Sequence, residues 1–302
     1  MDQAAGLRGI LQDGKAENER PRSFCESSRD EKPRNNIRVI SITSGKGGVG
    51  KTNVAANLAL ALHRMAKRVL ILDADLGLAN MDVLLGLNPR HTLSHVLDGE
   101  KRLDEIIVTA PGGIKLLPAA SGVQELTELD SSQRLHLLNE LDTLQDLFDV
   151  LLIDTGAGIS SNVMYFNFAA MEKVVVVTNE PTSLTDAYAL IKVLTLRYQQ
   201  KKFKILVNSA RNEAEAERVY RHLSMVVDKF LGSPSLDYFG WIPYDKLVPA
   251  AVRRQRLVLM EYPDAPASKS FMVLAKRMIS SDDESVFEGD IRFFWQRLLN
   301  YS

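Results

Sequence analysis

A glycine-rich loop lies between a predicted strand and a predicted helix early in the chain. Residues 39–62 read VISITSGKGGVGKTNVAANLALAL, in which Gly45, Gly50, Lys51 and Thr52 have the spacing G-x-x-x-x-G-K-[ST]. Glycines let the backbone wrap so that successive N–H groups point at phosphate oxygens, and the following helix adds the positive end of its dipole. The sequence therefore predicts a phosphate-binding loop at the edge of a sheet.

The residues of this loop have separate expected roles. Lys51 is expected to lie on the β- and γ-phosphates, and the Thr52 hydroxyl is expected to bind Mg²⁺. A glycine-rich turn without a ligand is the alternative, and the combination of strand, helix, lysine and threonine argues against it. The predicted nucleotide-binding residues here are Gly45, Lys46, Gly47, Gly48, Val49, Gly50, Lys51, Thr52 and Asn53.

Short apolar runs alternate with longer amphipathic runs from Ile37 onward, which is typical of βαβ units. Several runs are apolar throughout, as in strands whose two faces are both covered by helices. The pattern predicts an α/β fold with an open, mostly parallel, twisted sheet and helices on both faces. The predicted strands are 39–43, 69–73, 115–118, 150–154, 174–178, 205–208 and 238–242, and the predicted helices include 53–64, 133–147, 184–198, 213–230 and 268–278.

The segments on either side of a predicted 37–280 domain differ from it in composition. Residues 12–36 are polar and are predicted to be a flexible linker, and residues 1–11 have apolar positions at helical spacing, which indicates a partner-docking segment. Residues 281–289 are predicted to be an acidic tether. In residues 290–302, an amphipathic helix is predicted with one apolar face that consists of Ile291, Phe294, Trp295, Leu298 and Leu299.

Composition excludes several classes of protein. The one cysteine, Cys25, cannot form an internal disulfide and gives no support to a cysteine-ligated metal site. The formal charge of -1 argues against the broad cationic field of a nucleic-acid coat. No run approaches the roughly 20 apolar residues of a transmembrane helix, and the start of the chain lacks a secretory signal. A cytoplasmic protein is predicted.

Lys46 places a second cation in the loop. The run KGGVGKT resembles the deviant Walker A motif of the MinD and ParA family, whose signature lysine precedes the usual one by five residues. The resemblance implies a homodimer with ATP between the subunits, in which each Lys46 reaches the other subunit's nucleotide. A cation aimed at phosphate oxygens across an interface makes that interface depend on the γ-phosphate. The alternative is a solvated surface lysine.

Two carboxylate segments resemble the switches of this family. Asp75, in LDADLGLANMD, resembles the switch I aspartate that orients water and the magnesium shell, so Lys46, Lys51 and Asp75 are the predicted catalytic residues. Asp73 is expected to be structural. Asp154, in FDVLLIDTGAG, resembles the Walker B acid and is expected to hold Mg²⁺ through a water. A helix or turn cap is the alternative for Asp75 and Asp154.

Two glycines follow the second carboxylate. Gly156 and Gly158 give a backbone that can change conformation when the γ-phosphate leaves. Many MinD and ParA relatives have DxPxG here, so Gly156 in place of proline is a departure that changes the expected switch II geometry.

The base-binding residues distinguish ATP from GTP. The N/TKxD tetrapeptide of guanine-binding loops is absent from the predicted strand ends. LVNSARN and WIPYDKLVPAAV instead resemble the family's adenine pocket, with Asn208 facing the base and the loop from Pro243 to Asp245 covering it. Simple turn residues are the alternative, because Asn and Asp are common in turns.

The opening DQAAGLR resembles the DQAxxLR element of the FlhG (FleN) branch of flagellar regulators. That resemblance implies docking onto the signal-recognition-type GTPase FlhF, with Gln3 orienting its attacking water. It also implies action on flagellar assembly proteins and attachment of the ATP-bound dimer to the inner face of the cytoplasmic membrane. A short aromatic helix at the C-terminus fits weak, reversible membrane binding, although packing of its apolar face on the protein's own core is an alternative.

Three other functions remain open. A MinD-type cell-division regulator would share everything except the N-terminal element. A ParA-like segregation ATPase would bind DNA without sequence specificity. Its candidate phosphate contacts are Arg253, Arg254, Arg256, Lys201, Lys202 and Lys204. A metal-cluster carrier is disfavoured because Cys25 lies outside the predicted domain.

Overall fold

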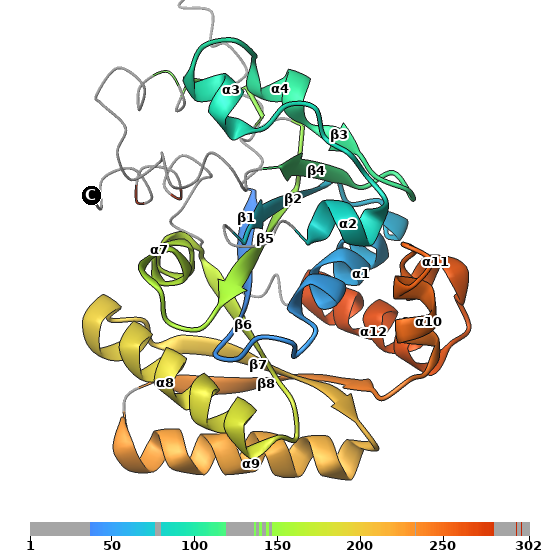
Figure 1. The fold of residues 1–302 in the computed structure, drawn as a ribbon. Coiled ribbons are helices and arrows are strands. Elements are labelled where there is room, and N and C mark those ends of the chain that lie inside the picture. Colours follow the sequence, from blue (N-terminus) through green and yellow to red (C-terminus); the bar gives the residue numbers. More distant parts are fainter. Residues whose placement is uncertain are drawn as a thin grey trace, which may run out of the picture. The chain divides into compact units, whose positions relative to one another are not determined.

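A single eight-stranded sheet organises the domain (Figure 1). The computed structural model describes residues 37–75, 80–118, 136, 139–140, 143–144, 147–232, 234–280, 294 and 297. The strand order is β3-β4-β2-β5-β1-β6-β7-β8. Neighbouring strands pair in parallel except β3 and β4, which are antiparallel. The predicted open, mostly parallel sheet is confirmed.

Each predicted strand is present in the sheet. Central strands β1, β2, β5 and β6 are buried along almost their whole length, which explains their continuous apolar runs. The edge strand β3 was not predicted, because two residues carry no periodicity. The strands are β1 (Arg38–Ser44), β2 (Val69–Ala74), β3 (Val108–Thr109), β4 (Lys115–Pro118), β5 (Val150–Ala157), β6 (Glu172–Val177), β7 (Lys202–Ala210) and β8 (Ser235–Pro243).

Helices connect the strands. Four of the predicted helices are confirmed as α1 (Lys51–Arg64), α8 (Pro181–Tyr198), α9 (Glu213–Phe230) and α12 (Pro266–Ser280). The predicted helix 133–147 lies mostly outside the described residues. Short helices that were not predicted are α2 (Met81–Leu85), α3 (Leu93–Leu97), α4 (Leu103–Ile106), α10 (Leu247–Val252) and α11 (Val258–Glu261). Within the described part of the chain, no helix is long and apolar enough to cross a bilayer.

Helix α7 (Ser161–Ala169) was also missed, for a different reason. Its sequence, SNVMYFNFA, is apolar nearly all round, so it lacks the one-sided period by which a surface helix is recognised. Most of its residues are buried, including the amide side chain of Asn167. It connects the end of β5 to β6 and packs on β1, β5 and α8.

Hydrophobic clusters fill both faces of the sheet. Helices α1, α2, α11 and α12 contribute to the cluster on one face, and α3, α4, α7, α8 and α9 contribute to two clusters on the other (Figure 1). Phe294, from the C-terminal segment, is 0% exposed and belongs to the cluster that contains residues of α3, α4 and α7. The predicted segments 1–11, 12–36 and 281–289, with Gln3, Ile291, Trp295, Leu298 and Leu299, lie outside the described residues.

Candidate nucleotide site

The predicted phosphate loop follows β1 directly and ends where α1 begins. Gly48 and Gly50 have φ values of 79° and 90°, a region that L side chains rarely adopt. A Cβ at Gly45 would lie 2.1 Å from the Asp186 backbone, and one at Gly50 would lie 2.5 Å from Asn208 Nδ2. The loop is therefore held between α8 and the end of β7, and side chains at these glycines would move it.

The first turn of α1 presents the two polar residues that the motif predicts. Lys51 is buried and close enough to Asp154 to favour the charged carboxylate, and Thr52 is half-buried beside it. The N-terminus of this helix adds positive potential. Lysine, hydroxyl and helix terminus thus meet where β1 ends, as a triphosphate site requires.

Three aspartates gather at the carboxyl ends of β2 and β5. Asp73 and Asp154 are register partners on these neighbouring strands, and Asp75 donates its backbone N–H to Asp73 Oδ1 at 3.3 Å. Burial, followed by the charge of Asp154, raises the pKa of Asp73 to about 7. Burial also raises the pKa of Asp154 to about 6, against the opposing effects of Lys51 and Thr52. Burial and mutual repulsion therefore disfavour the charged forms of these carboxylates.

These oxygens fit a hard divalent cation. Among the described residues, neither carboxylate oxygen of Asp154 has a partner with hydrogen-bond geometry, although the Thr52 hydroxyl is near enough to lower its pKa. Buried carboxylate and hydroxyl oxygens are the ligands that Mg²⁺ prefers. Mg²⁺ bound with a nucleotide would neutralise phosphate charge, and Asp75 lies half-buried beside these carboxylates.

Switch II is a continuation of β5 rather than a free loop. The strand extends to Ala157, which pairs with Ser44 of β1, and the Gly158 N–H donates to the Ser44 carbonyl at 2.9 Å. A Cβ at Gly156 would lie 3.3 Å from Val163 of α7 and 3.5 Å from Asp75 Oδ1. Gly156 therefore lets β5 approach α7 and Asp75 closely.

Lys46 lies at the outer surface of the loop, and its side chain is 34% exposed. Its ammonium donates to Glu180 Oε2 at 2.5 Å and to Thr182 Oγ1 at 2.8 Å. Neither Glu180 nor Thr182 was predicted from the sequence. Pro181 between them, at the start of α8, was a usable signal, because proline marks a helix beginning at the carboxyl edge of the sheet.

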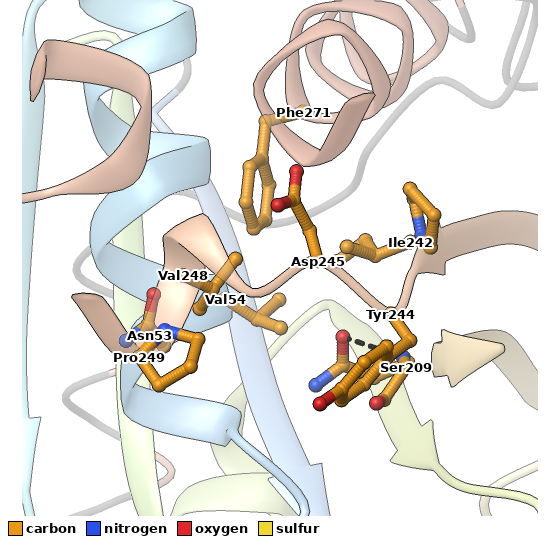
Figure 2. Close-up of a pocket in the computed structure, with 11 residues that line it drawn as sticks. Asn53, Val54, Ser209, Ile242, Tyr244, Asp245, Val248, Pro249 and Phe271 are labelled. Atoms are coloured by element: carbon orange, nitrogen blue, oxygen red, sulfur yellow. Dashed lines mark hydrogen bonds between the residues drawn. The ribbon is translucent and has the colours of Figure 1, made fainter. Parts of the chain in front are cut away.

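The predicted adenine residues line a pocket between α1 and the segment after β8 (Figure 2). Figure 2 shows Asn53 on one side of it and Ser209 and Tyr244 on the other. Tyr244 lies within the predicted loop from Pro243 to Asp245, although it was not named as a site residue, and it is 62% exposed beside the pocket. The pocket is lined by Asn53, Val54, Asn208, Ser209, Ile242, Pro243, Tyr244, Asp245, Val248, Pro249 and Phe271.

Two of the predicted residues use their side chains to fix the walls of this pocket. The Asn208 amide donates to the Val49 carbonyl at 2.8 Å, which ties β7 to the phosphate loop. The Asp245 carboxylate accepts the backbone N–H groups of Leu247 at 2.9 Å and Ala267 at 3.2 Å. Asn208 and Asp245 therefore make turn and cap interactions and also line the pocket.

The basic residues of the DNA-binding alternative do not form one surface. Lys202 begins β7 at the amino edge of the sheet, and Lys204 pairs with Glu172 at 2.7 Å. Arg253 instead follows α10, which comes after the carboxyl end of β8, and Arg254 pairs with Glu261 at 2.9 Å.

Comparison with known proteins agrees with this geometry. The sequence profile of the AAA domain family matches residues 37–207. The antiactivator FleN of Pseudomonas aeruginosa is 44% identical, over 88% of this chain and 94% of its own length. The flagellum site-determining protein YlxH of Helicobacter pylori is 32% identical, over 93% of this chain and 94% of its own length.

A solved structure extends the comparison to a bound nucleotide. The septum site-determining protein MinD of Pyrococcus horikoshii, in complex with Mg-ADP, superposes with a TM-score of 0.63 at 26% identity, covering 82% of this chain and 96% of that one. The family match covers more than half of the chain and the relatives are similar over most of its length, so the chain belongs to the MinD and ParA family of P-loop ATPases.

Proposed function

We propose that this chain is an ATP-driven dimerisation switch that regulates the number and placement of flagella. The similarity to FleN and to the flagellum site-determining YlxH supports the biological role. The single observation that carries the physical proposal is the position of Lys46, a second cation at the outer surface of the phosphate loop. Its partial exposure supports a contact with a facing subunit.

In the proposed dimer, Lys46 leaves Glu180 and reaches the γ-phosphate bound by the other subunit. The ion pair with Glu180 is partly exposed on both sides, so solvent screening leaves it worth little and exchange costs little. A phosphate oxygen in a closed interface is a stronger acceptor. ATP would thereby favour the dimer, and its hydrolysis would make the dimer dissociate.

Sedimentation velocity with Mg-ATP and Mg-ADP tests this step. In an Asp75→Ala background, in which hydrolysis is slowed, ATP is expected to produce dimers and ADP monomers. Adding Lys46→Ala is expected to leave nucleotide binding intact and abolish the dimer. A persistent monomer of Asp75→Ala at saturating ATP would contradict the proposal.

Membrane attachment forms the second part of the proposal. Phe294 and Arg297 are helical and face their own domain: Phe294 is fully buried, and the Arg297 guanidinium lies 5.4 Å from the Phe168 ring centroid. The burial of Phe294 agrees with the alternative in which the apolar face packs on the protein's own core. Membrane binding therefore needs release of the segment, and two released helices on one dimer would give avidity.

Flotation with phosphatidylethanolamine and phosphatidylglycerol vesicles tests the membrane step. Full-length protein is expected to float with ATP much more than with ADP, and a chain without residues 290–302 is expected to stay in solution in both. Equal flotation of the two chains would remove the role of this segment.

The third part concerns the N-terminal segment, which lies outside the described residues. We propose that it docks onto an FlhF-type GTPase and that the Gln3 amide orients the attacking water there. Single-turnover GTP hydrolysis by FlhF should accelerate with the wild type and not with Gln3→Ala. Acceleration by a chain that lacks residues 1–11 would remove the role of that segment. No acceleration by the wild type would instead favour the MinD-type cell-division alternative, which lacks the element.

A further inference from the structure

A network of buried, hydrogen-bonded polar side chains extends from switch II to α7. Ser41, Thr43, Thr155 and Asn167 are each 0% exposed, in a region otherwise filled by apolar side chains. The Asn167 amide donates to Thr43 Oγ1 at 2.9 Å and to the Val163 carbonyl at 2.7 Å. Ser41 Oγ donates to Asn167 Oδ1 at 2.9 Å. These side chains connect β1 and β5 to α7.

Thr155 is the member of this network that lies in switch II. It follows Asp154, and its hydroxyl has three acceptors in range: Gly156 O at 2.9 Å, Thr43 Oγ1 at 3.1 Å and Ile42 O at 3.2 Å. A hydroxyl has one proton to donate, so it can serve these acceptors only in turn. A shift of the Gly156 carbonyl would therefore change the hydrogen bond that Thr155 gives to Thr43.

The opposite end of this network, at Asn167, lies beside the C-terminal segment. Asn167 sits among the α7 residues Tyr165, Phe166 and Ala169, which share a hydrophobic cluster with buried Phe294. The ring of Phe168, the next residue along, lies 5.4 Å from the Arg297 guanidinium. The position of α7 therefore affects both described residues of that segment.

Buried amides and hydroxyls are stable only when they are satisfied, and a satisfied network specifies one arrangement more strictly than apolar contacts do. Movement of switch II breaks the arrangement at Thr155 and leaves Thr43 and Asn167 to find a new one. Because Asn167 also bonds the α7 backbone at Val163, the new arrangement moves the helix. A second hydrogen-bond arrangement of this kind would provide the two-state element that coupling between sites requires.

We propose that Asn167 is a positioning residue that couples the conformation of switch II to the packing of α7 against the C-terminal segment. This inference rests on the proposed function, because it explains how the nucleotide would release that segment. It assigns Asn167 no contact with nucleotide or magnesium.

The test uses Asn167→Ala in a Trp241→Phe background, in which Trp295 is the remaining one of the two tryptophans. Trp295 follows Phe294 in the sequence, so its emission reports whether the segment is buried. The ratio of vesicle-bound protein in ATP to that in ADP, and the ATP-induced change in Trp295 emission, should both fall roughly fivefold. Nucleotide affinity and ATP-dependent dimerisation should stay at the wild-type level.

Ser268→Ala is the matched control for loss of a buried hydrogen bond. Ser268 is also 0% exposed, but it lies on α12, which packs against the opposite face of the sheet, and its hydroxyl donates to the Tyr262 carbonyl at the end of α11. This variant should keep the wild-type ATP-to-ADP ratio. If it loses the ratio as Asn167→Ala does, the effect is one of general stability and the inference is wrong.

Thr43→Val and Thr43→Ser form a second pair in case Asn167→Ala does not fold. Valine keeps the shape and removes the hydroxyl, whereas serine keeps the hydroxyl, so only Thr43→Val should lose the nucleotide response. Wild-type response in both Asn167→Ala and Thr43→Val overturns the inference alone. A wild-type chain that itself shows no difference between ATP and ADP overturns the proposed function instead.

Discussion

The Lys46 ammonium lies 2.5 Å from the Glu180 carboxylate of its own chain, with Thr182 Oγ1 as a second acceptor at 2.8 Å. The phosphate loop and the start of α8 are thus joined by a charged hydrogen bond at the surface. The same α8 approaches the loop at Gly45, where a Cβ would overlap the Asp186 backbone. Loop and helix therefore form one unit, and the signature lysine is held along its outer edge.

Removing the carboxylate should free Lys46 in the nucleotide-free protein. In Glu180→Gln, acylation of the Lys46 amine by a small amine-reactive reagent should proceed roughly threefold faster, because an exposed ion pair contributes at most about 1 kcal/mol. Mass spectrometry of the labelled peptide measures the rate. Glu217→Gln, which breaks an exposed pair with Arg221 on α9, is the control and should leave Lys46 labelling unchanged.

Adding a methyl group at Gly156 should strain the contact between switch II and α7. The new Cβ would lie 3.3 Å from Val163 Cγ2 and 3.5 Å from Asp75 Oδ1, so one neighbour must move. Gly156→Ala should lower stability by about 1 kcal/mol, as overpacking does, and reduce the rate of ATP hydrolysis. Urea unfolding and a phosphate-release assay measure the two effects.

Val163→Ala supplies the matching test of the cause. If the strain arises at Val163, the double variant should recover part of the stability and hydrolysis that Gly156→Ala loses, so that the two changes are not additive. Additive losses would place the strain at Asp75 instead.

Much of this site was predictable from short stretches of sequence. The phosphate loop, Asp75 and Asp154 each follow a strong apolar strand, and parallel strands bring their carboxyl ends to one edge. The strand and helix that flank the loop were recognisable for the same reason, since their periods are local. The fold class followed from the alternation of such elements.

What escaped prediction depends on contacts between distant segments. Glu180 meets Lys46 across 134 positions of sequence, and Asn167 meets Thr43 across 124. Neither Glu180 nor Asn167 lies in a recognisable sequence motif. Helix α7 was missed because burial on all sides removes the amphipathic pattern, and the burial of Phe294 was left as an alternative because a helix face suited to lipid is equally suited to a protein core.

Asp73 should make the nucleotide-free protein less stable as the pH rises. Its folded-state pKa of about 7 lies above the ordinary value of 3.8, so the folded protein holds the proton more tightly and unfolding free energy falls between about pH 4 and 7. Asp73→Asn removes this cost. At pH 8 the variant should be more stable than wild type by about 1–3 kcal/mol.

At pH 4 to 5, where the wild-type carboxyl is protonated, the two proteins should have similar unfolding free energies. Urea titrations across this range, without magnesium or nucleotide, measure the difference. Equal stabilities at pH 8 would contradict the raised pKa and would assign Asp73 an ordinary charged state.

The contribution of Lys173 to the unfolding free energy should have the opposite pH dependence, at alkaline pH. Lys173 is the second residue of β6 and is 5% exposed. Burial, and then the charge of Arg297, lowers its pKa to about 8 from 10.5, against the opposing charge of Glu172. The folded protein binds this proton less tightly than the unfolded chain, so unfolding free energy should rise as the pH increases from about 8 to 10.5.

Lys173→Met keeps the aliphatic length and removes the buried charge. At pH 7 the variant should be more stable by about 1–3 kcal/mol, and the difference should shrink towards pH 10 as the wild-type lysine loses its proton. The lost hydrogen bond to Gln200 Oε1 costs less, because half-buried Gln200 can bond water. Since Arg297 belongs to the C-terminal segment, the variant should also hold that segment more tightly and bind vesicles less in ADP. Equal stability at pH 7, or a gain that persists at pH 10, would show that the charge of Lys173 is not the cause.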